Sequence, residues 1–240
     1  MLAIGDELLS GRTKDKNIGY LAEIMTEIGI DLSEVRIVPD DEARIVAAIN
    51  ELRQQYHYVF TSGGIGPTHD DITADAISKA FGVACIYDEK ALQMLAENYK
   101  SRGLEFTETR KRMARMPQGA VHIDNPVSTA PGFNIGNVYV MAGVPSVFEA
   151  MLHNVAPTLQ TGKKLLSKSV DCPFGEGVIG IPLSQIQENH ADTIIGSYPS
   201  FKNGSFSTQL VVRGHEQGAI DAAVREIQSM LDDLLAKQVQ

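Results

Sequence analysis

Three glycines and two adjacent aspartates crowd one short segment of the chain, TSGGIGPTHDD. Gly63, Gly64 and Gly66 permit backbone conformations that turn amide N–H groups inward, and main chain holds phosphate oxygens in this way. Asp70 and Asp71 repel each other unless a divalent cation or a helix terminus compensates. The segment therefore predicts a phosphate site with a divalent metal ion. The alternative is an ordinary strand-to-helix turn in which one aspartate caps the helix.

Three other polar stretches also lie where a predicted strand ends. They are IGDELLSGRTKDKN at 4–17, PDDE at 39–42 and AGVPS at 142–146. Because open parallel sheets bind their ligands at the carboxyl ends of the strands, we expect all four stretches to meet at one edge of a sheet.

The first two of these stretches add carboxylates and a polar loop. Asp6 comes directly after the first predicted strand, where no helix is expected to begin, so capping does not account for it. Helix capping accounts for only one of Asp40 and Asp41. Ser10 and Arg12 make the first loop polar and cationic, which suits contacts with phosphate or ribose. A solvated loop is the alternative.

A run of basic residues, ETRKRMARMP, stands out in an acidic protein. It places four cationic side chains within two helical turns, at Arg110, Lys111, Arg112 and Arg115. The pattern is typical of a solvated helix face, and a clamp for an anionic ligand is the alternative.

The composition is that of a soluble globular protein, with 43% hydrophobic and 21% charged residues in a chain of 240. We expect no membrane span and no signal peptide, because long apolar runs and a basic leader are missing. A net charge of −9 disfavours nucleic acid and anionic membranes as partners. The two cysteines, Cys85 and Cys172, lie far apart in sequence and are expected to be reduced thiols of a cytoplasmic protein.

Up to about residue 163, strands and helices alternate with short connections, which predicts an α/β domain with a mostly parallel sheet covered on both faces. Helices are expected at 15–28, 39–55, 71–82, 89–115 (broken near Gly103) and from Pro145, and strands at 1–4, 32–38, 57–62, 83–88 and 136–145. Beyond 163 the pattern changes to longer strands at 165–174, 192–201 and 206–214, a hairpin turn at 202–205 and a helix at 216–238. We therefore expect two domains, an α/β domain at 1–163 and a small α+β domain at 164–240.

Four ordered motifs resemble a known family. IGDELLSGRTKDKN, TSGGIGPTHDDITADA, NPVSTAPGF and AGVPSVFEAM occur in the order and at the spacing of the N-terminal domain of competence/damage-inducible protein A (CinA). That domain belongs to the molybdopterin-binding superfamily, together with MoaB, MogA and gephyrin-type proteins. The segment after about residue 165 is similar to the small KH-like domain that follows it. The chain departs from the pattern at Ser128, where relatives have glycine, and at Val147, where they have glutamate.

The resemblance implies a three-layer α/β/α sandwich with its ligand at the glycine-rich loop. It also implies chemistry on a pyrophosphate linked to adenosine, and the leading expectation is metal-dependent hydrolysis of ADP-ribose or a similar nucleotide. The alternatives are adenylyl transfer in molybdenum cofactor biosynthesis, or a module that binds a nucleotide or pterin without turnover. We expect a cytoplasmic homo-oligomer whose partner is a small nucleotide or pterin phosphate, with no nucleic acid and no membrane.

The motif positions also assign roles to residues. By similarity, Asp40 and Asp71 are the expected catalytic residues, and Asp6, Asp40 and Asp71 are expected to hold a divalent metal, with Mg²⁺ as the first choice. The expected ligand-binding residues are Gly63, Gly64, Gly66, Ser10, Arg12, Ser62, Thr68, Gly143 and Pro145.

Overall fold

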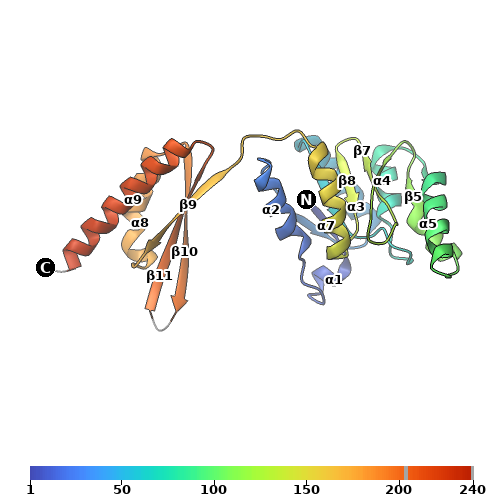
Figure 1. Cartoon of the computed structure of the whole chain (residues 1–240), viewed down its shortest axis with the longest axis horizontal. Coiled ribbons are helices and arrows are strands. Elements are labelled where there is room, and N and C mark those ends of the chain that lie inside the picture. Colours follow the sequence, from blue (N-terminus) through green and yellow to red (C-terminus); the bar gives the residue numbers. More distant parts are fainter. Residues whose placement is uncertain (203–204, 239–240) are drawn as a thin grey trace. The chain divides into compact units, whose positions relative to one another are not determined.

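The computed structural model describes residues 1–202 and 205–238 and divides into two compact units, Met1–Thr161 and Gly162–Gln240 (Figure 1). The domain boundary expected from the sequence, between residues 163 and 164, lies close to this division. No helix in the described ranges combines the length and the apolar composition that crossing a membrane requires.

The first unit contains a six-stranded mixed sheet that includes four of the five strands predicted for this part of the chain. In spatial order the strands are β2 (Arg36–Val38), β1 (Leu2–Ile4), β3 (Val59–Ser62), β8 (Val138–Met141), β7 (Gly132–Ile135) and β6 (Val121–Ile123). The first four run parallel, while β7 and β6 are antiparallel to their neighbours. Leu2 and Ile4 are almost completely buried, because β1 lies inside the sheet and has helices over both faces.

Helices cover both faces of this sheet, which confirms the expected three-layer α/β/α sandwich (Figure 1). One layer contains α2 (Asn17–Glu27) and α7 (Pro145–Val155), and the other contains α3 (Glu42–Gln55), α4 (Thr73–Phe81) and α5 (Glu89–Ser101). Leu21 and Phe148 represent the core of the first layer, and Ile49 and Ile77 that of the second. Each fully buried side chain of this size contributes about 1.5–3 kcal/mol.

Local sequence signals set several helix boundaries. The Asp41 carboxylate accepts a hydrogen bond from Arg44 N–H at 2.9 Å and caps α3. Gly82 ends α4 in the left-handed region at φ 67°, where glycine carries no steric penalty. Pro145 occupies the first turn of α7, where its missing N–H costs nothing.

The region around residues 85–117 differs from the sequence-based expectation. β4 (Cys85–Tyr87) pairs antiparallel with β5 (Arg115–Pro117) in a separate two-stranded sheet, so it does not extend the parallel sheet. The expected second helix is reduced to α6 (Glu108–Lys111) and the 3₁₀ turn η1 (Arg112–Ala114). Pairing with β4 draws the end of the predicted helix into an extended strand. The expectation that no helix begins at Asp6 is wrong, because the short helix α1 spans Asp6–Leu9. The remaining short element of this unit is η2 (Ala156–Thr158).

The second unit is α+β, as expected. Its antiparallel sheet has the order β10 (Thr193–Lys202), β11 (Ser205–Gly214), β9 (Leu166–Cys172), and it packs against α8 (Glu176–Asn189) and α9 (Gln217–Gln238). The sequence reading missed α8, because Pro182 and three glycines within or beside it are unfavourable in helix interiors. Residues 203–204 of the predicted hairpin turn lie outside the described residues.

Candidate functional site

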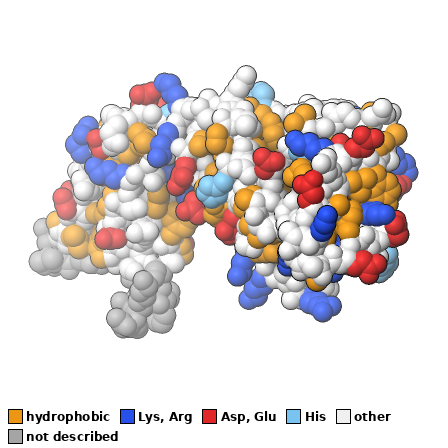
Figure 2. Space-filling view, turned by 45° about the vertical axis from the view of Figure 1, so that its right-hand side comes forward, with side chains coloured by type: hydrophobic (Ala, Val, Ile, Leu, Met, Phe, Trp, Pro, Cys, Tyr) orange, Lys and Arg blue, Asp and Glu red, His pale blue; other side chains and the backbone are white. Residues whose placement is uncertain are grey.

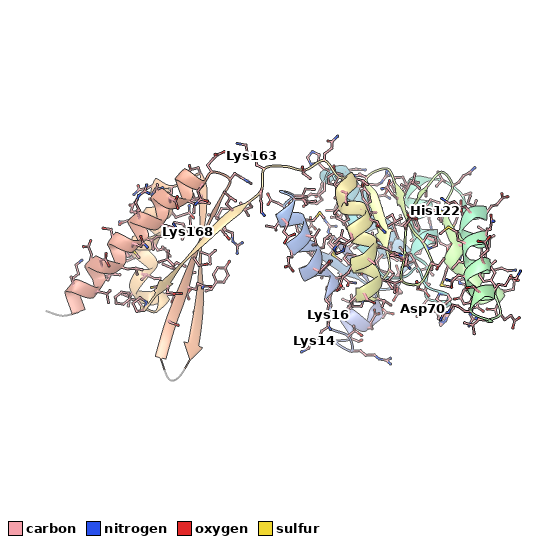
Figure 3. All side chains as sticks on the ribbon, viewed as in Figure 1. Lys14, Lys16, Asp70, His122, Lys163 and Lys168 are labelled. Atoms are coloured by element: carbon pink, nitrogen blue, oxygen red, sulfur yellow. The ribbon has the colours of Figure 1, made fainter. Side chains whose placement is uncertain are left out.

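A cavity of about 570 Å³ lies at the carboxyl ends of β1, β2, β3 and β8. Its wall includes residues from all four polar stretches that the sequence places after strands. The prediction that these stretches meet at one edge of the sheet is therefore confirmed. Lys14, Lys16 and Asp70 lie toward the same end of the first unit (Figure 3).

The structure brings most of the predicted site residues into this cavity, but not all of them. Those that line it are Gly63, Gly64, Gly66, Asp40, Asp71, Gly143 and Pro145. Those that do not are Asp6, Ser10, Arg12, Ser62 and Thr68. No site role was predicted from the sequence for the lining residues Glu7, Thr13, Met113, Asn125 and Ser128.

The glycines of the loop after β3 are needed for packing as well as for any ligand. A Cβ on Gly63 would lie 2.2 Å from the carbonyl oxygen of Ile4, the last residue of β1. A Cβ on Gly64 would lie 2.1 Å from Oγ1 of Thr73, the first residue of α4. Both glycines also have positive φ, at 108° and 69°. Only glycine therefore lets the loop pass this close to β1 and α4.

The backbone N–H groups of this loop are divided between structure and solvent. Gly63 N–H donates to the carbonyl of Met141 at 3.2 Å, and Gly66 N–H donates to the Asp71 carboxylate. Within the described part of the chain, the N–H groups of Gly64 and Ile65 have no protein acceptor. These two groups, rather than those of Gly63 and Gly66, can receive an anion.

The Asp71 carboxylate is turned into its own loop. Its Oδ1 accepts from Gly66 N–H at 2.7 Å, and its Oδ2 accepts from both N–H and Oγ1 of Thr68, at 2.7 and 2.5 Å. Helix α4 begins at Thr73, its N-cap residue is Ile72, and no side chain caps the helix by a hydrogen bond. The alternative of capping by Asp70 or Asp71 is therefore wrong. Asp71 therefore braces the loop, and both hydrogen-bonding groups of Thr68 are used in that brace.

The cavity increases the affinity of the Asp40 carboxylate for a proton. Its Oδ2 accepts from the N–H of Asp6, which begins α1. Burial raises the pKa of the Asp40 carboxyl above its ordinary value, and the negative charges of Asp6, Glu7 and Asp70 raise it further. Asp41 faces the other way and caps α3, so the ambiguity of the adjacent pair resolves with Asp40 at the cavity.

Asn17, at the start of α2, links the end of β3 to the loop after β8. Its Nδ2 donates to Ser62 Oγ at 2.7 Å and to the Gly143 carbonyl at 2.9 Å, and the side chain is buried. Ser62 is buried in this network and also lies 3.5 Å from the Ala142 carbonyl oxygen. Ser62, predicted to bind ligand, therefore holds the loops after β3 and β8 in place.

The loop after β6 forms the opposite wall. Asn125 is buried, and its Oδ1 accepts from the N–H groups of Val127 and Ser128 while its Nδ2 donates to Ser128 Oγ. Thr129 adopts φ 68°, a conformation that L-residues seldom take and that accumulates at functional sites. Ser128 and Val147, the two departures from the family pattern, both line the cavity.

The donor set of the cavity is oxygen, which is the preference of Mg²⁺. Glu7, Asp40, Asp70 and Asp71 all line it. Across the described residues, however, no three His, Cys, Asp or Glu side chains are placed together to hold an ion. The predicted trio of Asp6, Asp40 and Asp71 does not form such a group, because Asp6 lies outside the cavity wall and Asp71 bonds its own loop.

Comparison with known proteins places this fold and site in a family. Residues 1–161 match the family model described as "Probable molybdopterin binding domain", and residues 164–239 match "FAD synthase, middle domain". The chain therefore belongs to the molybdopterin-binding domain family, in its CinA N-terminal branch.

Individual relatives support this assignment. A protein of Pyrobaculum arsenaticum is 39% identical over 193 residues, which is 78% of this chain and 71% of the relative. A CinA-like protein of Sulfurihydrogenibium is 38% identical over 170 residues, 68% of this chain and 42% of the relative. The crystal structure of CinA from Thermoplasma acidophilum matches with a TM-score of 0.60 and 33% identity, covering 65% of this chain and 94% of that one. The resemblance seen in the sequence is confirmed.

Proposed function

We propose that this protein is a metal-dependent pyrophosphatase acting on ADP-ribose or a similar adenosine pyrophosphate. The observation that carries the proposal is the pairing, in one cavity, of two opposite kinds of group. Gly64 and Ile65 present N–H donors without protein acceptors, and Asp40 presents a carboxylate whose pKa is raised by burial and neighbouring charge. N–H donors suit phosphate oxygens, and uncompensated carboxylates suit a divalent cation.

The metal of this proposal is Mg²⁺, which proteins commonly bind through one or two carboxylates together with substrate phosphates rather than through a full protein cage. The oxygen donors of the cavity suit this mode of coordination, which needs only one or two carboxylates, and among the described residues no three acidic side chains come together. Asp40 would hold the ion, with Glu7 or Asp70 as the second carboxylate, since both lie on the same wall and both act on the Asp40 charge. When bound, Mg²⁺ supplies a Lewis acid for the phosphorus and lowers the pKa of water.

The chain's own residues supply positioning and electrostatics. The N–H groups of Gly64 and Ile65 orient the phosphate oxygens, and preorganised donors of this kind stabilise charge that develops in the transition state. Asp71 fixes those donors by holding Gly66 and Thr68. Its expected catalytic importance is then indirect, because it shapes the loop that binds the ligand.

The substrate class rests on two family names. The first unit belongs to a family named for molybdopterin binding, and the second matches a domain named for FAD synthase. FAD and ADP-ribose share a pyrophosphate attached to adenosine. A cavity that cradles a pyrophosphate would serve either one, so FAD belongs among the substrates to be tried.

The deciding experiment incubates the purified full chain with ADP-ribose or FAD and Mg²⁺, and follows AMP by chromatography. Release of AMP and ribose 5-phosphate from ADP-ribose, lost in Asp40→Asn but kept in the matched control Asp41→Asn, is the expected result. Asparagine is as good a helix cap as aspartate, so the control leaves α3 intact. Tight binding of both compounds without AMP would overturn the hydrolase in favour of a binding module. Adenylyl transfer from ATP to a pterin phosphate, without hydrolysis, would instead favour the cofactor-biosynthesis alternative.

A further inference from the structure

Most of the cationic side chains in the basic run at 110–115 are engaged in contacts with neighbouring residues. Three of its four cations have partners nearby, in the pairs Arg110–Tyr99, Lys111–Glu108 and Arg115–Asp75. These contacts agree with the solvated-face interpretation of the run. Arg112 is the exception.

Arg112 has no carboxylate within ion-pair distance among the described residues. Its Nη2 donates to the backbone carbonyl of Asp71 at 3.2 Å, and its Nε is buried without an acceptor. A buried donor left unpaired costs free energy, and native proteins rarely retain one without a reason. The cation is therefore tethered to the glycine loop, with part of its hydrogen-bonding capacity unused.

The position of Arg112 suggests what would use that capacity. Asp71, to which it bonds, and Met113, the next residue, both line the cavity, whereas Arg112 itself is not a lining residue and stands next to them. Glu7, Asp40 and Asp70 make the same wall acidic, and an anionic ligand would be repelled there without a local positive charge. Elsewhere cationic and acidic side chains are interspersed on the visible face of the protein (Figure 2), so the remaining surface offers no broad positive field on that face.

We propose that Arg112 binds the pyrophosphate of the ligand and sets the site's preference for a phosphorylated substrate. A guanidinium presents several donors in one plane, so a turn of the Arg112 side chain toward the cavity can bring one donor to a phosphate oxygen while another bonds the Asp71 carbonyl. The proposal deepens the function proposed above and rests on it for the substrate, but its test uses a simpler ligand.

The test measures the affinity of the full chain for inorganic pyrophosphate by calorimetry with saturating Mg²⁺. Arg112→Gln keeps an amide donor but removes the charge, and should weaken binding at least about 10-fold, as expected for loss of a charge-assisted bond to phosphate. The affinity of Arg112→Lys for pyrophosphate should lie between those of the wild type and Arg112→Gln. Arg110→Gln removes the same charge from the same run and should stay within about 2-fold of the wild type, because the Arg110 guanidinium stacks on Tyr99 and donates to the Glu105 carbonyl rather than contacting the glycine loop.

The outcomes separate this inference from a purely structural role and from the proposed function. Unchanged affinity in a folded Arg112→Gln variant, or no pyrophosphate binding by the wild type, would overturn it. If Arg112→Gln does not fold, Arg112→Lys decides: a lower melting temperature with wild-type affinity would show a loop brace only. Arg112-dependent pyrophosphate binding without AMP release from ADP-ribose would leave the inference standing and overturn the hydrolase.

Discussion

The N–H of Gly66 donates to Oδ1 of Asp71 across 2.7 Å and closes the glycine loop on itself. A Cβ on Gly66 would lie 2.6 Å from the other carboxylate oxygen of Asp71, so any larger residue at position 66 would clash with this carboxylate. This explains one member of the adjacent aspartate pair by loop architecture. The other, Asp70, also lines the cavity, and its side chain is 60% exposed.

The first prediction concerns Asp71→Asn. Asparagine offers one oxygen where the carboxylate offers two, so either Gly66 N–H or Thr68 N–H would face an amide NH₂ group. We expect a loss of about 1–3 kcal/mol in the free energy of unfolding, as for an unpaired donor. Turnover should fall at least about 10²-fold, equivalent to roughly 2.7 kcal/mol of transition-state stabilisation, because the phosphate donors lose their support.

Asp70→Asn is the matched control for that variant. It should leave the melting temperature nearly unchanged, because the Asp70 side chain is largely exposed. Thermal melting and single-turnover kinetics of both variants, with saturating Mg²⁺, make the comparison. A stable Asp71→Asn protein with wild-type turnover would show that the loop does not depend on this carboxylate. A larger loss of turnover at Asp70 than at Asp71 would identify Asp70, rather than Glu7, as the second carboxylate of the metal site.

The second prediction concerns Gly64. A Cβ at position 64 would point at Oγ1 of Thr73, the first residue of α4. Gly64→Ala should therefore act through stability and displace the bond from Thr73 Oγ1 to the Gly63 carbonyl. Overpacking of this kind costs about 1–3 kcal/mol beyond the strain of positive φ.

Gly103 provides the control that isolates the clash. Its φ of 65° is close to the 69° of Gly64, but nothing lies within 4 Å of its Cβ position. Gly103→Ala should lose only the backbone term, about 1 kcal/mol, because both alanines suffer the same left-handed strain. Chemical denaturation of the two variants gives the difference. Equal losses would mean that the Thr73 side chain moves aside freely.

The third prediction is that residues 1–161 fold and bind without the second unit. Each unit has its own buried core, and every residue that lines the cavity belongs to the first. The isolated segment should show a cooperative melt, and its affinity for pyrophosphate should stay within about 3-fold of the full chain, since compact units with their own core can fold alone. Aggregation of the segment under conditions that keep the full chain in solution would contradict the independence of the units.

The strands and helices that the sequence identified have strong, local signals. Alternation of apolar strands with capped helices identified β1, β3, β8 and the helices around them, because burial on both faces leaves continuous apolar runs. β6 and its partner β7 were not predicted, because His122, Gly132 and Asn134 interrupt any continuous apolar run there. The diversion of β4 to β5 depends on pairing across α5, which no local pattern encodes.

The site divides in the same way. Glycines with positive φ and strand-end aspartates were visible, because their residue types report backbone geometry and charge. The roles of Ser62 and Asn17 were not, because their bond joins positions 45 residues apart and depends on the folded sheet. The one signal in the sequence is Asn17 itself, a polar residue with two donors and an acceptor at the end of the first motif, which suits a side chain that joins two loops. Arg112 was hidden among neighbours of the same charge.

The last prediction uses the pKa of Asp40, which burial and nearby carboxylates raise above its value in the unfolded chain. The folded protein therefore holds this proton to higher pH than the unfolded chain does. Below the unfolded pKa both states are protonated and the site costs nothing. As pH rises from the unfolded pKa through the folded pKa, the unfolded chain gives up this proton first, and the stability of the folded protein falls over that window.

Asp40→Asn removes that charge and keeps an oxygen for the Asp6 N–H. In metal-free buffer at pH 7 its melting temperature should exceed that of the wild type, and the difference should shrink as pH falls toward 4. Added Mg²⁺ should raise the melting temperature of the wild type by mass action and that of the variant much less. The control Asp41→Asn should follow the wild type in both series. A destabilised Asp40→Asn at neutral pH, or an equal response of both proteins to Mg²⁺, would show that Asp40 is not the strained, cation-seeking carboxylate of this cavity.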